Sequence, residues 1–193
     1  MSRLGVADLT AAWWRTAKVP QQRQNEVIRL IRRILAHKAE YLAVEEAAGV
    51  PWWFVAALHY RESNLDFDTY LGNGDPLDKP TRNVPAGRGP FATWHEGAID
   101  ALRLQGYVGL SWLDMATALR RAERFNGVAY RKMGLPSPYV WAATTIQRPG
   151  KYVRDHVFDP KAVDFQLGVA AIWKYLAPPI PVIAPNKAKG KAA

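Results

Sequence analysis

Apolar residues that recur at helical spacing early in the chain limit its fold more than any other feature. From Gln21 to Ala48, arginine and lysine residues separate these apolar positions, as in an amphipathic helix. Gly49 suits a helix end and Pro51 a first turn, so a second helix is expected from there to about Glu62. The sequence therefore predicts a long, bent helix followed by another. The apolar positions of the first are Val27, Ile28, Leu30, Ile31, Ile34, Leu35, Tyr41, Leu42 and Val44.

A long segment without a helical period follows the second helix. Residues 64–92 are rich in glycine, proline and aspartate, which are turn formers. Loops of this length inside a compact domain are usually functional. We therefore expect a long loop or a small β-hairpin directly after the helix that ends near Glu62.

Further helices are indicated in the second half of the chain. A short helix is expected from Ser137, and a last helix from Asp159, where aspartate and proline precede an apolar period. Serine or threonine followed three residues later by an acidic residue has the spacing of a capping box. These spacings are Thr93 with Glu96, for a helix at about 94–105, and Ser111 with Asp114, for a helix at about 112–124.

The pattern as a whole predicts one mainly α-helical domain. The apolar segments offer no obvious place to divide the 193 residues. We assign residues 1–177 to this domain, with 1–20 as an N-terminal helical extension. Residues 178–193, rich in proline and lysine, are expected to form a flexible tail.

Composition and charge narrow the classes of protein that the chain resembles. It has no cysteine, which excludes disulfides and thiolate metal sites. It shows no signal-peptide pattern and no apolar run of about 18 residues, so we expect synthesis in the cytoplasm and no transmembrane segment. The formal net charge of +9 favours polyanions such as nucleic acid, anionic lipid or the bacterial envelope, without choosing between them.

Motifs for cofactors and metals are incomplete in this sequence. "GNGD" lacks the third glycine of a dinucleotide-binding loop, and "WHEGAI" lacks the second histidine of a zinc-protease helix. The four histidines are scattered, and no G-x-S-x-G elbow is present. We therefore expect neither a cofactor nor a metal ion.

Glu62 stands out because it ends an apolar run that begins at Pro51. Helical spacing puts it on the turn above Leu58, where apolar packing would raise its pKa. A carboxylic acid that is protonated near neutral pH can donate a proton to the oxygen of a leaving sugar, as a glycosidase requires. The alternative interpretation is an ion pair of Glu62 with Arg61 or with a basic helix.

The stretch "HYRESNLDF" (59–67) resembles the glutamate-serine motif of the lysozyme superfamily, particularly of lytic transglycosylases, goose-type lysozymes and related phage endolysins. "PAGRGPF" (85–91) stands in the place of the glycine-containing floor loop of these families. "ERFNGVAYRKMGLPSPYVW" (123–141) stands in the place of their tyrosine-asparagine-alanine-glycine segment and its downstream tyrosine. This resemblance, over roughly residues 26–176, implies a lysozyme-like fold in which Glu62 is the catalytic acid.

The chain departs from these families in two places. Phe125-Asn126-Gly127 lacks the usual tyrosine and alanine, and the floor loop lacks the methionine-glutamine pair that is common in transglycosylases. Both departures weaken the resemblance to transglycosylases in particular.

The two reactions that the resemblance allows, transglycosylation and hydrolysis, differ in the number of catalytic carboxylates that they need. A transglycosylase needs a single acid, because the N-acetyl group of the substrate assists. A hydrolase usually adds a second carboxylate, about 5 Å away as nucleophile or about 6.5 to 9.5 Å away as base. Asp75, on the turn "LGNGDPL", resembles the supporting aspartate of goose-type lysozymes, although an aspartate before proline also simply forms a turn. The loop also holds Asp66, Asp68 and Asp78.

Aromatic and amide side chains near Glu62 could line a groove for sugars. Aromatic residues at helical spacing also commonly pack in a core. Asn126 and Tyr139 match positions that usually hold the substrate and the acid in the families named above. The predicted substrate-binding residues are Tyr60, Ser63, Tyr70, Asn73, Asn126, Tyr139 and Trp141.

These observations predict a peptidoglycan hydrolase, a muramidase or endolysin that cleaves the β-1,4 bond between N-acetylmuramic acid and N-acetylglucosamine. We expect a monomer that is attracted to the anionic bacterial envelope by its basic surface and acts on the cell wall in a phage or prophage context. The alternatives are a lytic transglycosylase with 1,6-anhydro products and a non-catalytic peptidoglycan-binding module on the same fold. Charge alone supports a nucleic-acid binder, and no specific nucleic acid is expected as a partner.

Overall fold

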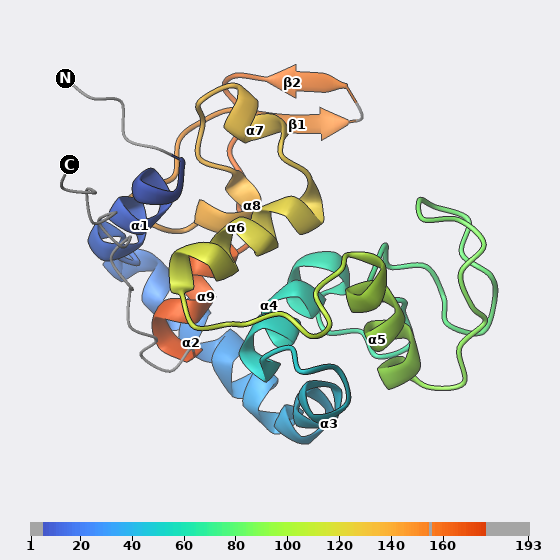
Figure 1. Ribbon diagram of the computed structural model, residues 1–193. Helices are drawn as coiled ribbons and strands as arrows, with labels where there is room; N and C mark the ends of the chain where they lie inside the picture. The colour runs from blue at the N-terminus through green and yellow to red at the C-terminus, as the bar shows by residue number, and fades with distance from the viewer. Residues whose placement is uncertain (1–5, 155, 177–193) are drawn as a thin grey trace, which may run out of the picture.

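The computed structural model describes residues 6–154 and 156–176, and it is mainly helical, as the sequence predicts (Figure 1). None of the helices in these residues has the length and apolar character that crossing a bilayer requires. The predicted tail over 178–193 lies outside the described residues. The helices are α1 (Val6–Thr16), α2 (Gln21–Ala36), α3 (Lys38–Ala48), α4 (Trp52–Ser63), α5 (Trp94–Leu104), α6 (Met115–Asn126), α7 (Ala129–Lys132), α8 (Pro138–Trp141) and α9 (Val169–Leu176), and the strands are β1 (Lys151–Arg154) and β2 (Val157–Asp159).

Helix α4 runs through the middle of the molecule. All its residues from Trp53 to Tyr60 are buried, so every face of this stretch is covered, as expected of a helix that is apolar all round. Helices α3, α6 and α9 pack against it, and Figure 1 shows it between α6 and α9 on one side and α3 and α5 on the other. Trp173 of α9 donates its indole N–H to the carbonyl of Trp53 at 3.1 Å. Helix α4 is therefore buried in the core from its first turn to Tyr60.

The predicted starts and ends of the first helices are confirmed. The long bent helix is two helices, α2 and α3, separated by His37. Gly49 ends α3 in the left-handed conformation (φ 67), which glycine adopts without strain. Thr93 caps α5 by accepting a hydrogen bond from the N–H of Glu96 at 3.2 Å.

The predicted start of α6 is wrong by three residues. Asp114, and not Ser111, is the N-cap, because its carboxylate accepts hydrogen bonds from the N–H groups of Ala116 and Thr117 at 3.2 and 2.9 Å. An ionised carboxylate at this position also interacts favourably with the helix dipole. The helix therefore begins at Met115.

The last helix is shorter than the sequence indicated. It begins at Val169 and not near Asp159, because Asp159 ends β2, which pairs antiparallel with β1, and residues 160–168 form neither helix nor strand. Gly168 precedes the helix, and its N–H donates to the carbonyl of Ala142 at 3.1 Å. A Cβ atom on Gly168 would lie 2.6 Å from the Ala142 nitrogen, so only glycine fits this close approach.

The segment after α4 is the long loop that the sequence predicts. Apart from an isolated bridge between Thr69 and Pro76, residues 64–93 contain neither helix nor strand. The two-stranded sheet of the described residues is β1–β2, near the other end of the sequence. After α4, antiparallel pairing is limited to the Thr69–Pro76 bridge, flanked by hydrogen bonds from the Leu77 N–H to the Asp68 carbonyl at 3.0 Å and from the Tyr70 N–H to the Asp75 carbonyl at 2.7 Å. Figure 1 shows the loop extending beyond α5, away from β1 and β2.

Candidate active site around Glu62

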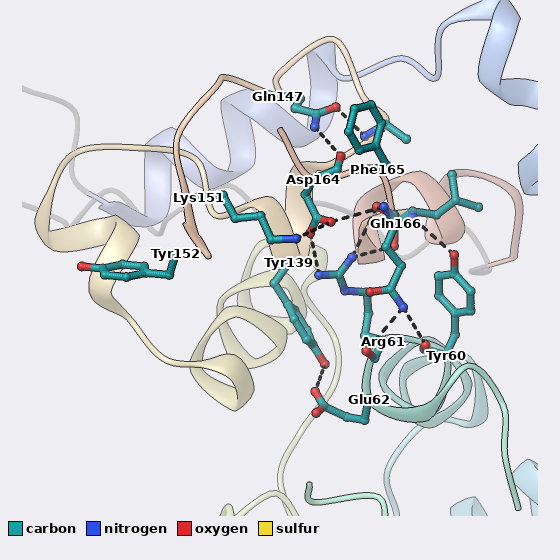
Figure 2. A network of polar contacts seen from close by, with 12 residues as sticks. Tyr60, Arg61, Glu62, Tyr139, Gln147, Lys151, Tyr152, Asp164, Phe165 and Gln166 are labelled. Carbon is teal, nitrogen blue, oxygen red and sulfur yellow. Dashed lines mark hydrogen bonds and ion pairs between the residues drawn. The ribbon is translucent and has the colours of Figure 1, made fainter. Parts of the chain in front are cut away.

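Glu62 is the penultimate residue of α4, which ends where Asn64 takes a left-handed conformation (φ 56). The Glu62 side chain is half-buried. Its Oε1 accepts a hydrogen bond of 2.7 Å from the hydroxyl of Tyr139, which lies 77 residues later on α8 (Figure 2). The fold thus brings Tyr139 to Glu62, as its match to an acid-holding position in the lysozyme superfamily implied.

The environment of Glu62 favours its protonated form. Burial raises the pKa of Glu62 to about 7, above the ordinary value of 4.5. The hydrogen bond from Tyr139 and the positive charge of Arg61 both lower the pKa, but they do not outweigh desolvation. A carboxyl with this pKa can give up a proton and take one back near neutral pH.

Arg61 does not form the ion pair with Glu62 that the sequence left open. Its Nη2 lies 2.9 Å from Oδ2 of Asp164, and the two side chains are only 8% and 5% exposed. Lys151 Nζ lies 3.1 Å from the other carboxylate oxygen of Asp164. The Arg61 guanidinium is also 4.8 Å from the centre of the Tyr139 ring. The charge of Arg61 is therefore matched by Asp164, and Glu62 is left with Tyr139.

The segment that carries Asp164 is tied to the last turns of α4. Arg61 donates hydrogen bonds of 3.3 Å to the carbonyls of both Gln166 and Leu167. The side-chain amide of Gln166 donates in turn to the carbonyl of Tyr60 at 3.0 Å. The Tyr60 hydroxyl accepts a long hydrogen bond from the Leu167 N–H at 3.4 Å. Tyr60, predicted to bind sugar, is thus buried in this joint.

A cavity of about 590 Å³ adjoins Tyr139. Asn126, the last residue of α6, also lines it, so Asn126 and Tyr139 share one cavity. Glu62 is not a lining residue and is linked to the cavity through Tyr139. The charged lining residues are Arg61, Lys151, Arg154 and Asp164, with His156 beside them.

Three other residues predicted to bind sugar lie outside this cavity. Tyr70 is fully buried, and its hydroxyl donates to an aspartate of α5 at 2.9 Å. Trp141 is buried and packs edge-on against Trp13, with ring centres 5.6 Å apart. The hydroxyl of Ser63 donates to the carbonyl of His59 at 3.4 Å. Tyr70 and Trp141 thus have the core positions that the sequence analysis named as their alternative.

The carboxylate of Asp75 is occupied by its own loop. Oδ2 accepts hydrogen bonds of 2.8 Å from the N–H groups of Arg82 and Asn83, and Oδ1 accepts one of 2.6 Å from the Asn83 side chain. The N–H of Asn83 is the main cause that holds the pKa of Asp75 below its usual value. Asp75 borders a separate, smaller cavity of about 280 Å³. Its observed contacts organise the loop.

The turn that carries Asp75 nevertheless lies against the end of α4. A Cβ atom on Gly74 would be 3.5 Å from the carbonyl oxygen of Glu62. Asn73, predicted to bind substrate, stabilises this turn instead of facing the cavity beside Tyr139. Its side-chain oxygen accepts from the Asp75 N–H, and its amide donates to the Asn83 carbonyl, each at 3.0 Å.

His59, one turn before Glu62, was not selected from the sequence. It is fully buried, with Nδ1 3.1 Å from the Tyr41 hydroxyl and Nε2 2.9 Å from the Asp66 carbonyl oxygen. Because a carbonyl only accepts, Nε2 carries the proton and Nδ1 accepts from Tyr41. Burial lowers the pKa of His59 to about 4. Its place inside the apolar run was the signal for a buried, neutral histidine.

Within the described residues, no group of three or more histidine, aspartate and glutamate side chains is arranged to hold a metal ion. Asp164 and Lys151 had no signal in the sequence, because each lies about 90 residues or more from Arg61 and in a stretch without a motif. Comparison of the chain with protein-family models, with curated proteins and with solved structures finds no match.

Proposed function

We propose that this protein cleaves the glycan strands of peptidoglycan at the β-1,4 bond between N-acetylmuramic acid and N-acetylglucosamine, with Glu62 as the general acid. One observation carries the proposal. Glu62 is a half-buried carboxyl with a pKa of about 7, and it has a hydrogen-bond donor in Tyr139 while the neighbouring Arg61 is paired elsewhere. The substrate class comes from the resemblance of "HYRESNLDF", and the net charge of +9 favours an anionic envelope.

In the proposed reaction, protonated Glu62 transfers its proton to the bridging oxygen while the bond from that oxygen to C1 breaks. Tyr139 occupies Oε1, which leaves Oε2 to carry the proton. The carboxylate then removes a proton from the group that attacks C1. This group is water in hydrolysis and the C6 hydroxyl of the same sugar in transglycosylation, and either restores the proton on Glu62.

Two observations support transglycosylation over hydrolysis. The Asp75 carboxylate, predicted as the second acid, accepts three hydrogen bonds within its loop. Asp164, the one carboxylate among the described residues that line the cavity, is held by Arg61 and Lys151. A single acid assisted by the N-acetyl group of the substrate is sufficient for transglycosylation. We therefore propose 1,6-anhydro ends as the main product.

The test is digestion of purified sacculi by the wild type and by Glu62→Gln, with the products identified by mass spectrometry. Glutamine keeps an acceptor for Tyr139 but has no transferable proton, so the rate should fall by about 10²-fold or more. Glu46→Gln, at an exposed position on α3, is the matched control and should keep full activity. Circular dichroism establishes that all three proteins are folded.

Each outcome of this experiment has a distinct meaning. Anhydro ends indicate transglycosylation, and reducing ends indicate hydrolysis. Turnover of Glu62→Gln within a few-fold of wild type would remove Glu62 from the catalytic role. A wild type that binds sacculi without releasing fragments would be a wall-binding module. Binding to nucleic acid that falls steeply with salt and persists in Glu62→Gln would support the basic nucleic-acid binder.

A further inference from the structure

Arg61 and Glu62 are adjacent in the sequence, yet their side chains have different partners around the same tyrosine (Figure 2). The hydroxyl of Tyr139 binds the Glu62 carboxyl at 2.7 Å. The Arg61 guanidinium lies 4.8 Å from the centre of the Tyr139 ring. Tyr139 itself is only 3% exposed, so it has little freedom to leave this position.

Asp164 is the residue that holds Arg61 in place. It forms the buried ion pair with Arg61 at 2.9 Å and contacts Lys151 at 3.1 Å. Its backbone is fixed as well, because the Gln147 side chain donates to the Asp164 carbonyl at 2.8 Å and accepts from the Ala143 N–H at 2.9 Å. Burial alone would raise the pKa of Asp164, but the two cations keep it below the usual value. Asp164 is therefore ionised at neutral pH.

We propose that Asp164 is a positioning residue for Glu62: it holds the Arg61 guanidinium against the Tyr139 ring and so prevents Arg61 from pairing with the Glu62 carboxylate. The part of Asp164 in catalysis rests on the function proposed above, whereas its effect on the pKa of Glu62 does not. Asp164 touches no substrate in this scheme and acts through Arg61.

The charged and titratable groups around Glu62 determine how removal of the Asp164 carboxylate would change the pKa of Glu62. Arg61 faces Glu62 from α4 and Tyr139 faces it from α8, while Asp164 and Lys151 act from behind Arg61. Without Asp164, the buried guanidinium has lost its counter-ion, and Glu62 is the adjacent carboxyl that feels its charge. An opposite charge that is no longer neutralised favours ionised Glu62 by about one pKa unit or more.

The experiment measures Glu62 directly by titrating its side-chain carboxyl carbon by NMR in the wild type, in Asp164→Asn and in Arg61→Met/Asp164→Asn. We expect Asp164→Asn to lower the pKa of Glu62 by about one unit or more, and the double variant to return it to the wild-type value or above. Asp164→Glu keeps the negative charge and should stay within about half a unit of wild type. Glu46→Gln, at an exposed position on α3, is the control and should change nothing.

The rate of sacculus digestion gives a second readout. With a lower pKa of Glu62, kcat/KM in Asp164→Asn should match wild type near pH 5 and be lower at pH 8, by about tenfold if the pKa is one unit lower. A loss of equal size at every pH would mean a merely structural role. If the wild type digests nothing while the NMR titration shows the lowered pKa, the proposed function fails and the positioning role of Asp164 stands.

Two results would overturn the proposal. One is an unchanged pKa of Glu62 in folded Asp164→Asn. The other is an equally lowered pKa in Asp164→Asn and in the double variant, since the effect would then not depend on Arg61. Breaking a buried ion pair by removing one partner can unfold a protein, and the double variant removes both charges. If only the double variant folds, a Glu62 pKa about one unit below wild type in that variant also overturns the proposal.

Discussion

The hydroxyl of Tyr139 donates a hydrogen bond of 2.7 Å to Oε1 of Glu62 and thereby joins α8 to the end of α4. Burial, with the nearby charge of Glu62, raises the pKa of Tyr139 well above its usual value of 10. The tyrosine therefore keeps its proton wherever Glu62 titrates and remains a donor to both forms of the carboxyl. This contact holds one carboxyl oxygen in the same orientation whether Glu62 is protonated or ionised.

Tyr139→Phe should lower the rate of sacculus digestion by about tenfold and move the basic limb of the pH–rate profile upward. The reason is that the hydrogen bond stabilises ionised Glu62, so its removal raises the pKa of Glu62 above about 7. The measurement is kcat/KM from pH 5 to 9. Tyr175→Phe, at an exposed tyrosine of α9, is the control. A profile identical to wild type would show that the contact has no part in the reaction.

Glu62→Gln should make the protein more stable above pH 7 and leave it nearly unchanged at pH 4.5. Between pH 4.5 and 7 folded Glu62 keeps a proton that the unfolded chain releases, so the free energy of unfolding of wild type falls as pH rises. The full difference, up to about 3 kcal/mol, is reached above pH 7. Urea unfolding at pH 4.5 and 8 measures it, with Glu46→Gln as control. An equal effect at both pH values would contradict the buried, protonated state of Glu62.

His59→Phe should destabilise the protein by about 2 to 4 kcal/mol at pH 7, because it leaves the Tyr41 hydroxyl and the Asp66 carbonyl without their partner. The folded pKa of His59 is lowered from 6.5 to about 4, so wild-type stability falls as pH drops through that window. Phenylalanine does not titrate, and the gap between the two proteins should narrow from pH 7 to pH 4. Urea unfolding across this range checks it, and a constant gap would mean that His59 is not buried and neutral.

Asp75→Asn should reduce the rate of sacculus digestion by less than about tenfold and make residues 73–83 more sensitive to trypsin. The carboxylate accepts two backbone and one side-chain hydrogen bond, and an amide has one oxygen to replace them. Glu46→Gln, at an exposed position on α3, is the control for both assays. A loss of about 10²-fold with unchanged resistance to trypsin would instead assign Asp75 the role of a second carboxylate.

The sequence predicted helix positions and ends correctly where the determining residues lie within a few positions of one another. The amphipathic period of α2 and α3, the glycine after α3 and the capping threonine of α5 all act within a few residues, and the structure agrees with each of them. The two errors at helix starts have a non-local or competing cause. At α6, Asp114 is the better cap than Ser111. At α9, the expected first residue, Asp159, pairs in β2 with β1, and residues 160–168 between this strand and the helix form neither helix nor strand.

In the candidate site, too, the features that depend on nearby residues could be predicted from sequence, and those that depend on distant residues could not. The carboxylate at the end of an apolar helix could be selected from sequence, because burial next to Leu58 follows from helical spacing alone. The partner of the Arg61 side chain could not be selected from sequence, since Asp164 lies 103 residues away in a segment without a motif. For the same reason, aromatic residues of the core, such as Trp141, could not be told from residues that line a groove.

The sequence by itself determined the helical class, the long loop after α4 and Glu62 as the residue whose ionised form is disfavoured. These properties depend on contacts between residues a few positions apart, which helical spacing makes predictable. The tertiary structure alone decided that Asp164 pairs with Arg61 and that Asp75 is bound by its own loop, whereas the contact of Tyr139 with Glu62 follows what the resemblance implied for Tyr139. Those choices depend on which distant segments pack at the end of α4, and a charge in a protein interior takes its effect from the partner placed beside it.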